Sequence, residues 1–410
     1  MFPRSPTALL YAARASRGFG DGFAAIILPA YLIEIGFDPL QIGVVATAAL
    51  LGSAALTLAI GLLAPQFQIR TLLLVCAGLM VLTGIALPSF QHVAFIVAIA
   101  FVGTINPTIG DIGIHIPLEQ AALAGKASDQ TRTRMFSRYS LVGALSIAAG
   151  ALAAGLPDFL VSTGMAKITA MQMMFYIYAA LGLVGAGFYG LLPQTSAENR
   201  EQEKPTALGP SRRMIYKLAA LFSLDSFAGG FTVQSLLALW LFKRFEFSLA
   251  AASTFFFWAN LLAAFSYPVA THLAKRFGLV NTMVFTHIPS SICLILVALT
   301  SNLTIVMTLL LLRSALSQMD VPTRTSYVMA VVTPAERTAA ASITAAPRSL
   351  ASAISPAISG ALIASSFINL PLLLCALLKI TYDVTLLASF RQIRPPEEPH
   401  AGEAHDGARS

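Results

Sequence analysis

Apolar stretches of helix-spanning length recur along the whole chain, and they constrain its fold more than any other feature. A helix needs about 20 apolar residues to cross the hydrocarbon core of a bilayer, and about twelve stretches of that kind are present. They lie near residues 18–36, 42–64, 71–89, 92–112, 136–156, 170–192, 215–241, 249–270, 279–300, 303–321, 339–364 and 369–390. The pattern predicts an all-α polytopic membrane protein, because long helices satisfy their own backbone polar groups in lipid.

The scarcity of charge excludes a soluble protein of this size. Only 11% of the 410 residues are charged, whereas about 25% is usual for soluble proteins. The mean hydropathy of +0.75 agrees with this reading. A surface that faces lipid needs few charges, so we expect the lipid bilayer to be the main partner of the chain.

The distribution of basic residues predicts an orientation. If the first segment starts in the cytoplasm, most of the 26 lysines and arginines fall on the cytoplasmic side. The exceptions are Lys167, Lys243 and Arg244 outside and Arg313, Arg348 and Lys379 within the spans. This bias follows the positive-inside rule and places both termini in the cytoplasm, with a bacterial inner membrane as the expected location. The net charge of +7 therefore reflects topology, and we expect no nucleic-acid partner.

The chain divides at its longest polar interruption. Residues 194–213 follow the sixth apolar segment and are predicted to be a cytoplasmic linker. We expect one six-helix bundle over 1–193 and a second over 214–390. The polar residues 391–410 are expected to form a disordered cytoplasmic tail.

The two halves are weakly similar to each other. Three pairs of segments align at nearly constant offsets, namely 22–32 with 230–240, 62–75 with 272–285, and 139–152 with 348–361. A parallel duplication of six helices is one of the architectures of secondary transporters, in which the substrate site lies between the repeats.

Two loops carry a resemblance to a known family. Residues 61–70 read GLLAPQFQIR, and residues 271–280 read THLAKRFGLV. Both resemble the loop G-x-L-A-D-R-x-G-R-[RK] of the major facilitator superfamily, with Pro65 and Lys275 where that family has aspartate. The stretch 334–362 is also similar to the family's eleventh helix and the loop before it. The resemblance implies twelve helices in two pseudo-symmetric six-helix bundles and a central cavity lined by helices 1, 4, 7 and 10.

Three aspartates within the spans are candidates for proton coupling. Asp21 and Asp225 occupy similar depths in the first and seventh spans, and Asp111 lies in the fourth. Ionisable groups within a membrane are costly and usually serve a function. The structural alternative is that Asp21 and Asp225 cap helix ends or pair with nearby cations, namely Arg14, Arg17, Arg212 and Lys217.

The fourth span is polar and contains two prolines. Pro107 and Pro117 each remove a backbone donor, and irregular backbone at membrane depth occurs where it lines a cavity or lies within protein. We therefore expect Asn106 and Asp111 to serve the site. His115 and Glu119, in contrast, are expected to be solvated on a cytoplasmic extension of the helix.

A single arginine, Arg313, follows a leucine-rich run near the middle of the tenth span. It cannot deprotonate there, and with Leu309 and Gln318 it resembles the family's intramembrane signature L-x-x-x-R-x-x-x-x-Q. That signature is more frequent in the family's fourth helix, where this chain has Thr104. The other candidates for substrate or ion-pair contacts are Asn106, Gln234, Asn260, Gln318 and Asp320.

The twelfth and eighth spans add two further expectations. Lys379 and Asp383 are four residues apart on one helix face and are predicted to form a structural ion pair. The eighth span contains STFFFWANLLAAF, which predicts a cavity wall of phenylalanine, methionine and tryptophan.

These features favour a secondary active transporter, monomeric, that moves a small organic solute by alternating access. The expected mode is proton-coupled export, with Asp21 or Asp225 carrying the proton. One alternative is uptake or facilitated passage of an anionic metabolite at Arg313, and another is a non-transporting sensor or scaffold. No phosphate-binding loop, zinc-protease motif or nucleophile elbow is present, so we expect no enzyme, metal or cofactor.

Overall fold

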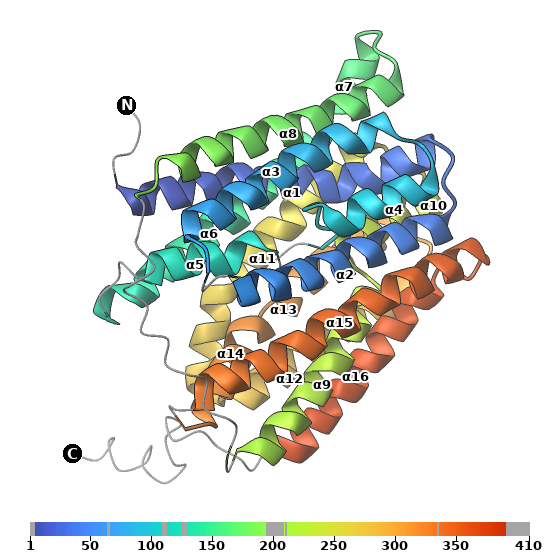
Figure 1. Ribbon diagram of the computed structural model, residues 1–410. Coiled ribbons are helices and arrows are strands. Elements are labelled where there is room, and N and C mark those ends of the chain that lie inside the picture. Colours follow the sequence, from blue (N-terminus) through green and yellow to red (C-terminus); the bar gives the residue numbers. More distant parts are fainter. Residues whose placement is uncertain are drawn as a thin grey trace.

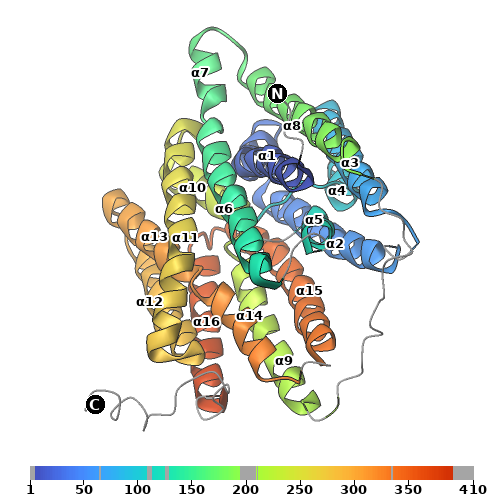
Figure 2. The same ribbon diagram turned by 90° about the vertical axis from the view of Figure 1, so that its left-hand side faces the viewer.

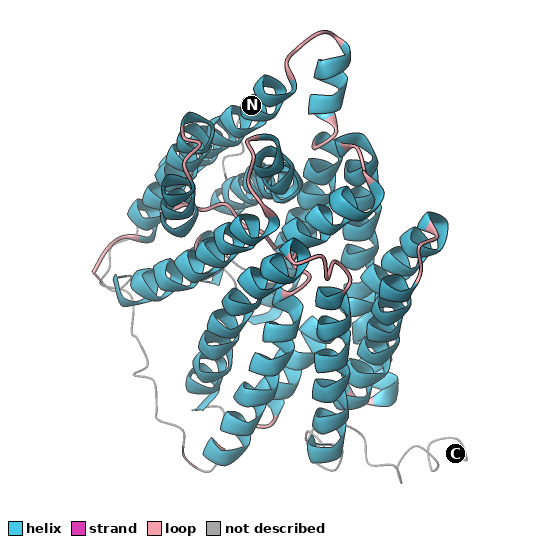
Figure 3. Cartoon of the chain, turned by 90° about the vertical axis from the view of Figure 1, so that its right-hand side faces the viewer, coloured by secondary structure: helices cyan, strands magenta, loops and turns pink. Residues whose placement is uncertain are grey.

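The computed structural model describes residues 5–63, 66–108, 113–124, 129–193, 209, 211–333 and 336–390. Asp111, Ala64, Pro65, most of the expected linker and the expected tail lie outside these residues. The described chain is helical throughout, with turns and short loops between the helices (Figure 3).

Each half of the chain contributes eight helices to the described structure (Figure 1). The first half contains α1 Pro6–Glu34, α2 Pro39–Leu63, α3 Ile69–Ser89, α4 Val93–Val102, α5 His115–Ala124, α6 Asp129–Ala153, α7 Leu156–Ser162 and α8 Lys167–Gly190. The second half contains α9 Arg212–Gly230, α10 Gln234–Phe245, α11 Leu249–Phe277, α12 Leu279–Leu299, α13 Leu303–Ser317, α14 Asp320–Ala330, α15 Arg337–Ala364 and α16 Leu370–Phe390.

These helices form twelve membrane passes in two six-helix bundles. Among the described residues, 7 helices are by themselves long and apolar enough to span a bilayer. Three other passes are broken into two helices each: α4 with α5, α9 with α10, and α13 with α14. They are the fourth, seventh and tenth passes. The breaks in the fourth and tenth passes occur at equivalent places in the two repeats, whereas the first pass, equivalent to the seventh, is the single helix α1.

The first helix begins earlier than its apolar stretch indicates. Ser5 accepts a hydrogen bond from Ala8 N at 3.2 Å, and Pro6 follows at the first helical position, so α1 starts there rather than near residue 18. Asp21 consequently lies near the middle of the helix. Arg14 and Arg17 are only 2% and 6% exposed, so both side chains are buried within the first bundle.

The two bundles contact each other mainly through two pairs of helices, α2 with α15 and α6 with α11 (Figure 2). Glycines permit the first contact, because a Cβ atom at Gly43 would lie 2.5 Å from Pro356 O. One at Gly360 would lie 2.3 Å from Pro39 O. Helices α1 and α9 begin at the same end of the two bundles, and we call this end the linker end. The α2–α15 contact lies toward the opposite end, near the start of α2.

Candidate functional site

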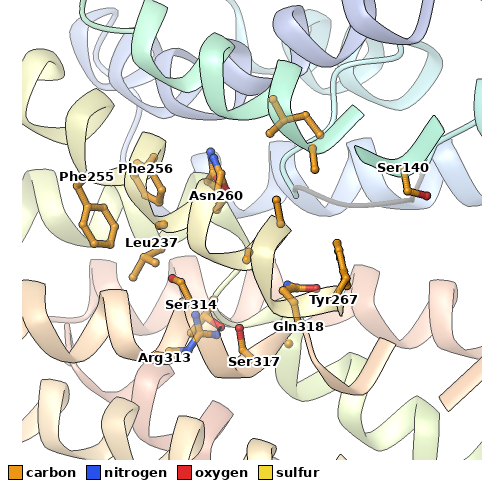
Figure 4. A pocket seen from close by; sticks show the side chains of 18 of the residues that line it. Ser140, Leu237, Phe255, Phe256, Asn260, Tyr267, Arg313, Ser314, Ser317 and Gln318 are labelled. Carbon is orange, nitrogen blue, oxygen red and sulfur yellow. Dashed lines mark hydrogen bonds between the residues drawn. The ribbon is translucent and has the colours of Figure 1, made fainter. Parts of the chain in front are cut away.

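A cavity of about 220 Å³ lies between the bundles. The second bundle supplies most of its wall, from α9, α10, α11, α13 and α16, and α1 and α6 of the first bundle complete it. Figure 4 shows Leu237, Phe255 and Phe256 at one end of the cavity and Ser140, Tyr267 and Gln318 at the other. Arg313, Ser314 and Ser317 lie between these two groups. The cavity is therefore apolar at one end and polar at the other.

Every charged residue among the described residues that line this cavity is basic. They are Arg14, Arg313 and Lys379. Arg313 is half-buried, and its Nη2 donates a 3.5 Å hydrogen bond to the Thr232 hydroxyl. Within the described part of the chain, Arg313 forms no ion pair with a carboxylate. The cavity thus offers a guanidinium whose charge the surrounding protein does not neutralise.

Two amide side chains add unsatisfied donors to the same wall. Gln234, at the start of α10, and Asn260, on α11, both line the cavity. Their buried amide nitrogens, Gln234 Nε2 and Asn260 Nδ2, have no hydrogen-bond partner among the described residues. Buried donors of this kind normally find an acceptor, so an acceptor-rich ligand fits them.

The cavity wall differs in part from the one expected. Phe255 and Phe256 contribute to it as predicted, with ring centroids 4.9 Å apart. Trp258 is 51% exposed, and neither it nor a methionine lines the cavity in the described structure. The run of aromatic residues on α11 spreads around the helix, because neighbouring positions point in different directions.

A smaller cavity of about 20 Å³ lies inside the first bundle. Asp21 and Asn106 border it together with Arg14, Arg17 and His115. Asp21 is half-buried, and its Oδ1 accepts a 3.3 Å hydrogen bond from the Tyr178 hydroxyl. Asn106 therefore lies beside Asp21 rather than in the larger cavity.

His115 and Glu119 are buried, so the expectation that water surrounds them is wrong. Glu119 is 0% exposed, and its Oε2 lies 2.8 Å from Arg17 Nη2. The hydroxyls of Tyr139 and Tyr189 also donate hydrogen bonds to this carboxylate. The ion pair attaches α5, the second helix of the broken fourth pass, to α1.

Asp225 is at the centre of a buried ion-pair cluster in the second bundle. Its Oδ1 lies 2.6 Å from Lys379 Nζ, and its Oδ2 lies 2.9 Å from Arg324 Nη2. Arg324 also pairs closely with Asp320, four residues earlier on α14. Asp320 is 3% exposed and belongs to this cluster, not to the lining of the cavity.

The expected direct ion pair between Lys379 and Asp383 is not formed. Lys379 pairs with Asp225 instead, and His287 of α12 lies between the two expected partners. His287 Nδ1 is 3.0 Å from Asp383 Oδ1, and His287 Nε2 is 3.1 Å from Lys379 Nζ. A lysine and an aspartate four residues apart both turn toward neighbouring helices here, because those helices carry stronger partners.

Sequence reasoning missed Arg324 and His287. The sequence pattern places Arg324 among the cytoplasmic arginines. In the structure its side chain is buried, and the residue is 5% exposed. The spacing of Asp320 and Arg324, four residues apart on one helix, is a signal that points to their pairing. His287 has no comparable signal, because its partners Lys379 and Asp383 lie 92 and 96 residues away in sequence.

The two buried ion pairs occupy equivalent positions with opposite polarity. Arg17 of α1 and Asp225 of α9 are separated by the offset of 208 that relates 22–32 to 230–240. Arg17 forms an ion pair with Glu119 on α5. Asp225 forms an ion pair with Arg324 on α14. In both bundles the first pass therefore anchors the second half of a broken pass.

Comparisons with known proteins agree on one family. The model of the Major Facilitator Superfamily matches residues 10–312 and 219–410. An uncharacterized membrane protein of Saccharomyces cerevisiae is 24% identical over 417 residues, which cover 93% of each chain.

Solved structures share the fold at low identity. A variant of the nucleoside transporter NupG has a TM-score of 0.77 and 15% identity, and the match covers 94% of this chain and 100% of that one. A D-xylose-proton symporter has a TM-score of 0.70 and 16% identity, with 93% and 96% covered. These matches favour a transporter over a sensor or scaffold and over an enzyme. The chain belongs to the major facilitator superfamily and is a multi-pass membrane transporter.

Proposed function

We propose that this protein transports a small organic anion by alternating access, with the cavity between the bundles as its binding site. The single observation that carries the proposal is Arg313, a cavity-lining guanidinium without a carboxylate partner in the described structure. A charge removed from water is costly unless it is paired, and a bound anion would supply the missing partner.

The remaining lining supports an anion that also has an apolar part. The donors Gln234 Nε2 and Asn260 Nδ2 suit carboxylate, sulfonate or phosphate oxygens. Phe255, Phe256 and Leu237 offer an apolar surface at the other end of the cavity. A volume of about 220 Å³ is below the roughly 300–1,000 Å³ typical of pockets for drug-sized ligands, which favours a small solute.

Contacts between the bundles support one orientation of the cavity. Hydrogen bonds join Ala357 N to the Thr47 hydroxyl at 3.0 Å and Ala250 N to Asp158 Oδ2 at 2.8 Å. Both lie toward the end opposite the linker. We propose that the linker end faces the cytoplasm, in agreement with the distribution of basic residues, and that this conformation receives solute from that side.

Proton-coupled export is the second candidate, and the placement of Asp21 favours it. Asp21 borders a polar cavity, and within the described structure its side chain accepts one hydrogen bond, a 3.3 Å contact with the Tyr178 hydroxyl. Asp225, in contrast, contacts two cations. A carboxylate with few partners exchanges a proton more readily than one held by two ion pairs, so Asp21 is the stronger proton carrier of the two.

A ligand-stabilisation screen tests the proposal of an anion site. The purified protein is heated with organic carboxylates, sulfonates and phosphate esters and, separately, with organic cations and neutral sugars. A ligand at about 100 times its Kd stabilises the folded state by about 2.7 kcal/mol. We expect anions to raise the unfolding temperature of the wild type and of the matched control Arg213→Gln, an exposed arginine of α9, but not that of Arg313→Gln.

Two results would contradict the proposal. One is stabilisation by cations or neutral sugars but by no anion. The other is an Arg313→Gln variant that binds the same anions as the wild type. Uptake of a radiolabelled hit into proteoliposomes, with and without a pH gradient, then separates proton-coupled transport from facilitated passage.

A further inference from the structure

The buried ion-pair cluster around Asp225 contains one more carboxylate than it has cations that contact those carboxylates. Its carboxylates are Asp225, Asp320 and Asp383. The cations that contact them are Lys379 and Arg324. Arg348 of α15 is close, but its Nε donates to the Ser226 hydroxyl at 3.2 Å rather than to a carboxylate. One carboxylate is therefore without a cation.

That carboxylate is Asp383, which is 0% exposed. Its Oδ1 is bonded to His287 Nδ1, and its Oδ2 has no hydrogen-bond partner among the described residues. Tyr382, beside it, is buried with its hydroxyl also unpartnered. A buried carboxylate without a compensating charge costs several kcal/mol, and binding a proton removes that charge.

Lys379 determines which ring nitrogen of His287 carries the hydrogen. An ammonium group only donates hydrogen bonds, so His287 Nε2, at 3.1 Å from Lys379 Nζ, has to accept one. The single ring proton of His287 then sits on Nδ1 and is donated to Asp383 Oδ1 at 3.0 Å. A second ring proton on Nε2 would face the ammonium, so it is disfavoured while Lys379 stays in place. Within the described structure, the other charged groups around the pair are Asp225, Asp320, Arg324 and Arg348.

Lys379 also lines the central cavity. It therefore links the proposed anion site to the His287–Asp383 pair, which lies deeper in the bundle. We propose that Asp383 is a proton-binding site separate from Asp21, that His287 relays its proton to and from the cavity, and that Lys379 gates the relay. This inference rests on the proposed function only in assigning an anion to the cavity.

The relay follows from the geometry. An anion in the cavity attracts the ammonium of Lys379 away from His287, which frees Nε2. A proton from cavity water then bonds to Nε2, and the proton on Nδ1 passes to the Asp383 carboxylate, so that one proton enters and one carboxylate is neutralised. The proton stays on Asp383 while the hydrogen of His287 lies on Nε2, because Lys379 cannot donate to that nitrogen. When the proton passes back from Asp383 to Nδ1 and the Nε2 proton returns to cavity water, Lys379 again donates to Nε2 and the path is closed.

Infrared spectroscopy on the full-length protein in lipid nanodiscs tests the proton site without any substrate. The protein is labelled with carboxyl-¹³C aspartate, and difference spectra are recorded between acidic and alkaline pH. We expect a carboxylic-acid band that carries the aspartate isotope shift, that is lost in Asp383→Asn and that is retained in the matched control Asp38→Asn, an exposed acid before α2.

Further variants keep the test decisive if Asp383→Asn does not fold. Asp383→Glu should retain a carboxylic-acid band but without the aspartate isotope shift. His287→Gln should retain the band and slow its hydrogen–deuterium exchange, whereas His272→Gln, an exposed histidine of α11, should not. A band unchanged in Asp383→Asn or Asp383→Glu would overturn the inference. An Asp383 band in a protein that no anion stabilises would instead overturn the proposed function alone.

Discussion

Arg17 and Glu119 illustrate what a buried charge requires at the scale of single residues. The pair is 2.8 Å apart with side chains 7% and 0% exposed, and two tyrosine hydroxyls complete the shell of the carboxylate. Desolvation of both ions is offset only because each has its partner. The pair holds α5 against α1, although the described residues 103–108 that follow α4 are not helical.

Removal of one partner should therefore strongly lower the stability of the folded protein. We expect Arg17→Leu to lower the free energy of unfolding by about 3–5 kcal/mol, because it leaves Glu119 buried without a cation. Replacing both residues, Arg17→Leu with Glu119→Gln, should recover a large part of this loss. Denaturation of the purified variants in detergent measures the free energy of unfolding of the single and of the double variant.

The control for this prediction is an exposed ion pair of the same chain. Lys167 and Glu34 are 2.7 Å apart, but their side chains are 54% and 32% exposed. We expect Lys167→Leu to cost at most about 1 kcal/mol. Equal losses for Arg17→Leu and Lys167→Leu would contradict the argument from burial.

At the scale of elements, the contact between α2 and α15 depends on glycine. Gly43 and Gly360 bring the two backbones together, and Cβ atoms there would lie 2.5 Å and 2.3 Å from carbonyl oxygens of the facing helix. Both helices cross the membrane, and their contact lies toward the end opposite the linker.

A larger residue at this contact should force the two helices apart. Overpacking a close contact costs about 1–3 kcal/mol, so we expect Gly360→Val to destabilise this conformation by that amount. Gly185 provides the control, because a Cβ atom there would meet open space. Gly185→Val should leave the unfolding temperature nearly unchanged, and a similar loss for both variants would count against the role of the α2–α15 contact.

Glu336 holds the start of the second bundle to the loop before α15. Its Oε1 accepts from Gly209 N at 2.6 Å, and its Oε2 accepts from the hydroxyls of Ser211 and Thr333 at 2.8 Å and 2.9 Å. The hydrogen bond from Ser211, followed by those from Thr333 and the backbone, lowers the pKa of this carboxyl below its ordinary value.

The sign of this pKa shift predicts how the attachment depends on pH. A carboxyl whose folded-state pKa is lowered stabilises the fold fully above its unfolded-state pKa, and this contribution is lost as pH falls through the folded-state pKa. We expect the Gly209 amide to be protected from hydrogen exchange at neutral pH and to lose protection only below the ordinary pKa of glutamate. Glu336→Gln should weaken the protection at neutral pH and remove its pH dependence, once the intrinsic exchange rate is corrected for.

At the scale of the whole molecule, the two bundles meet around a central cavity, and the proposed orientation implies that its end away from the linker is closed. The described contacts of Gly43, Gly360 and Thr47 lie on the side away from the linker. The polar end of the cavity, with Ser140, Tyr267 and Gln318, lies on the other side of Arg313 (Figure 4).

This arrangement predicts one-sided access. In a background without the three buried cysteines Cys76, Cys293 and Cys375, we expect Ser317→Cys to react with a membrane-impermeant thiol reagent from the linker side only. Thr163→Cys, exposed beyond α7 at the opposite end, should react from the other side. Equal labelling of Ser317→Cys from both sides would contradict the closed end.

Much of the fold could be predicted from the sequence, because lipid as a solvent demands long apolar helices and few charges. The twelve passes, the break near Pro107 and the repeat all follow from local patterns. Apolarity does not mark where a helix begins, however. Capping by Ser5 and Pro6 lets α1 begin well before its apolar stretch. Arg14 and Arg17 therefore lie on the helix and are buried within the protein.

The sequence by itself therefore determined the solvent, the number of passes and the presence of Arg313 within a span. Only the tertiary structure decided which charges meet. Lys379 contacts Asp225 rather than Asp383, Arg324 and His287 join the cluster, and Arg313 faces the cavity without an acid beside it in the described structure. Partners on different helices are chosen by how the helices pack, and no spacing along one helix encodes that choice.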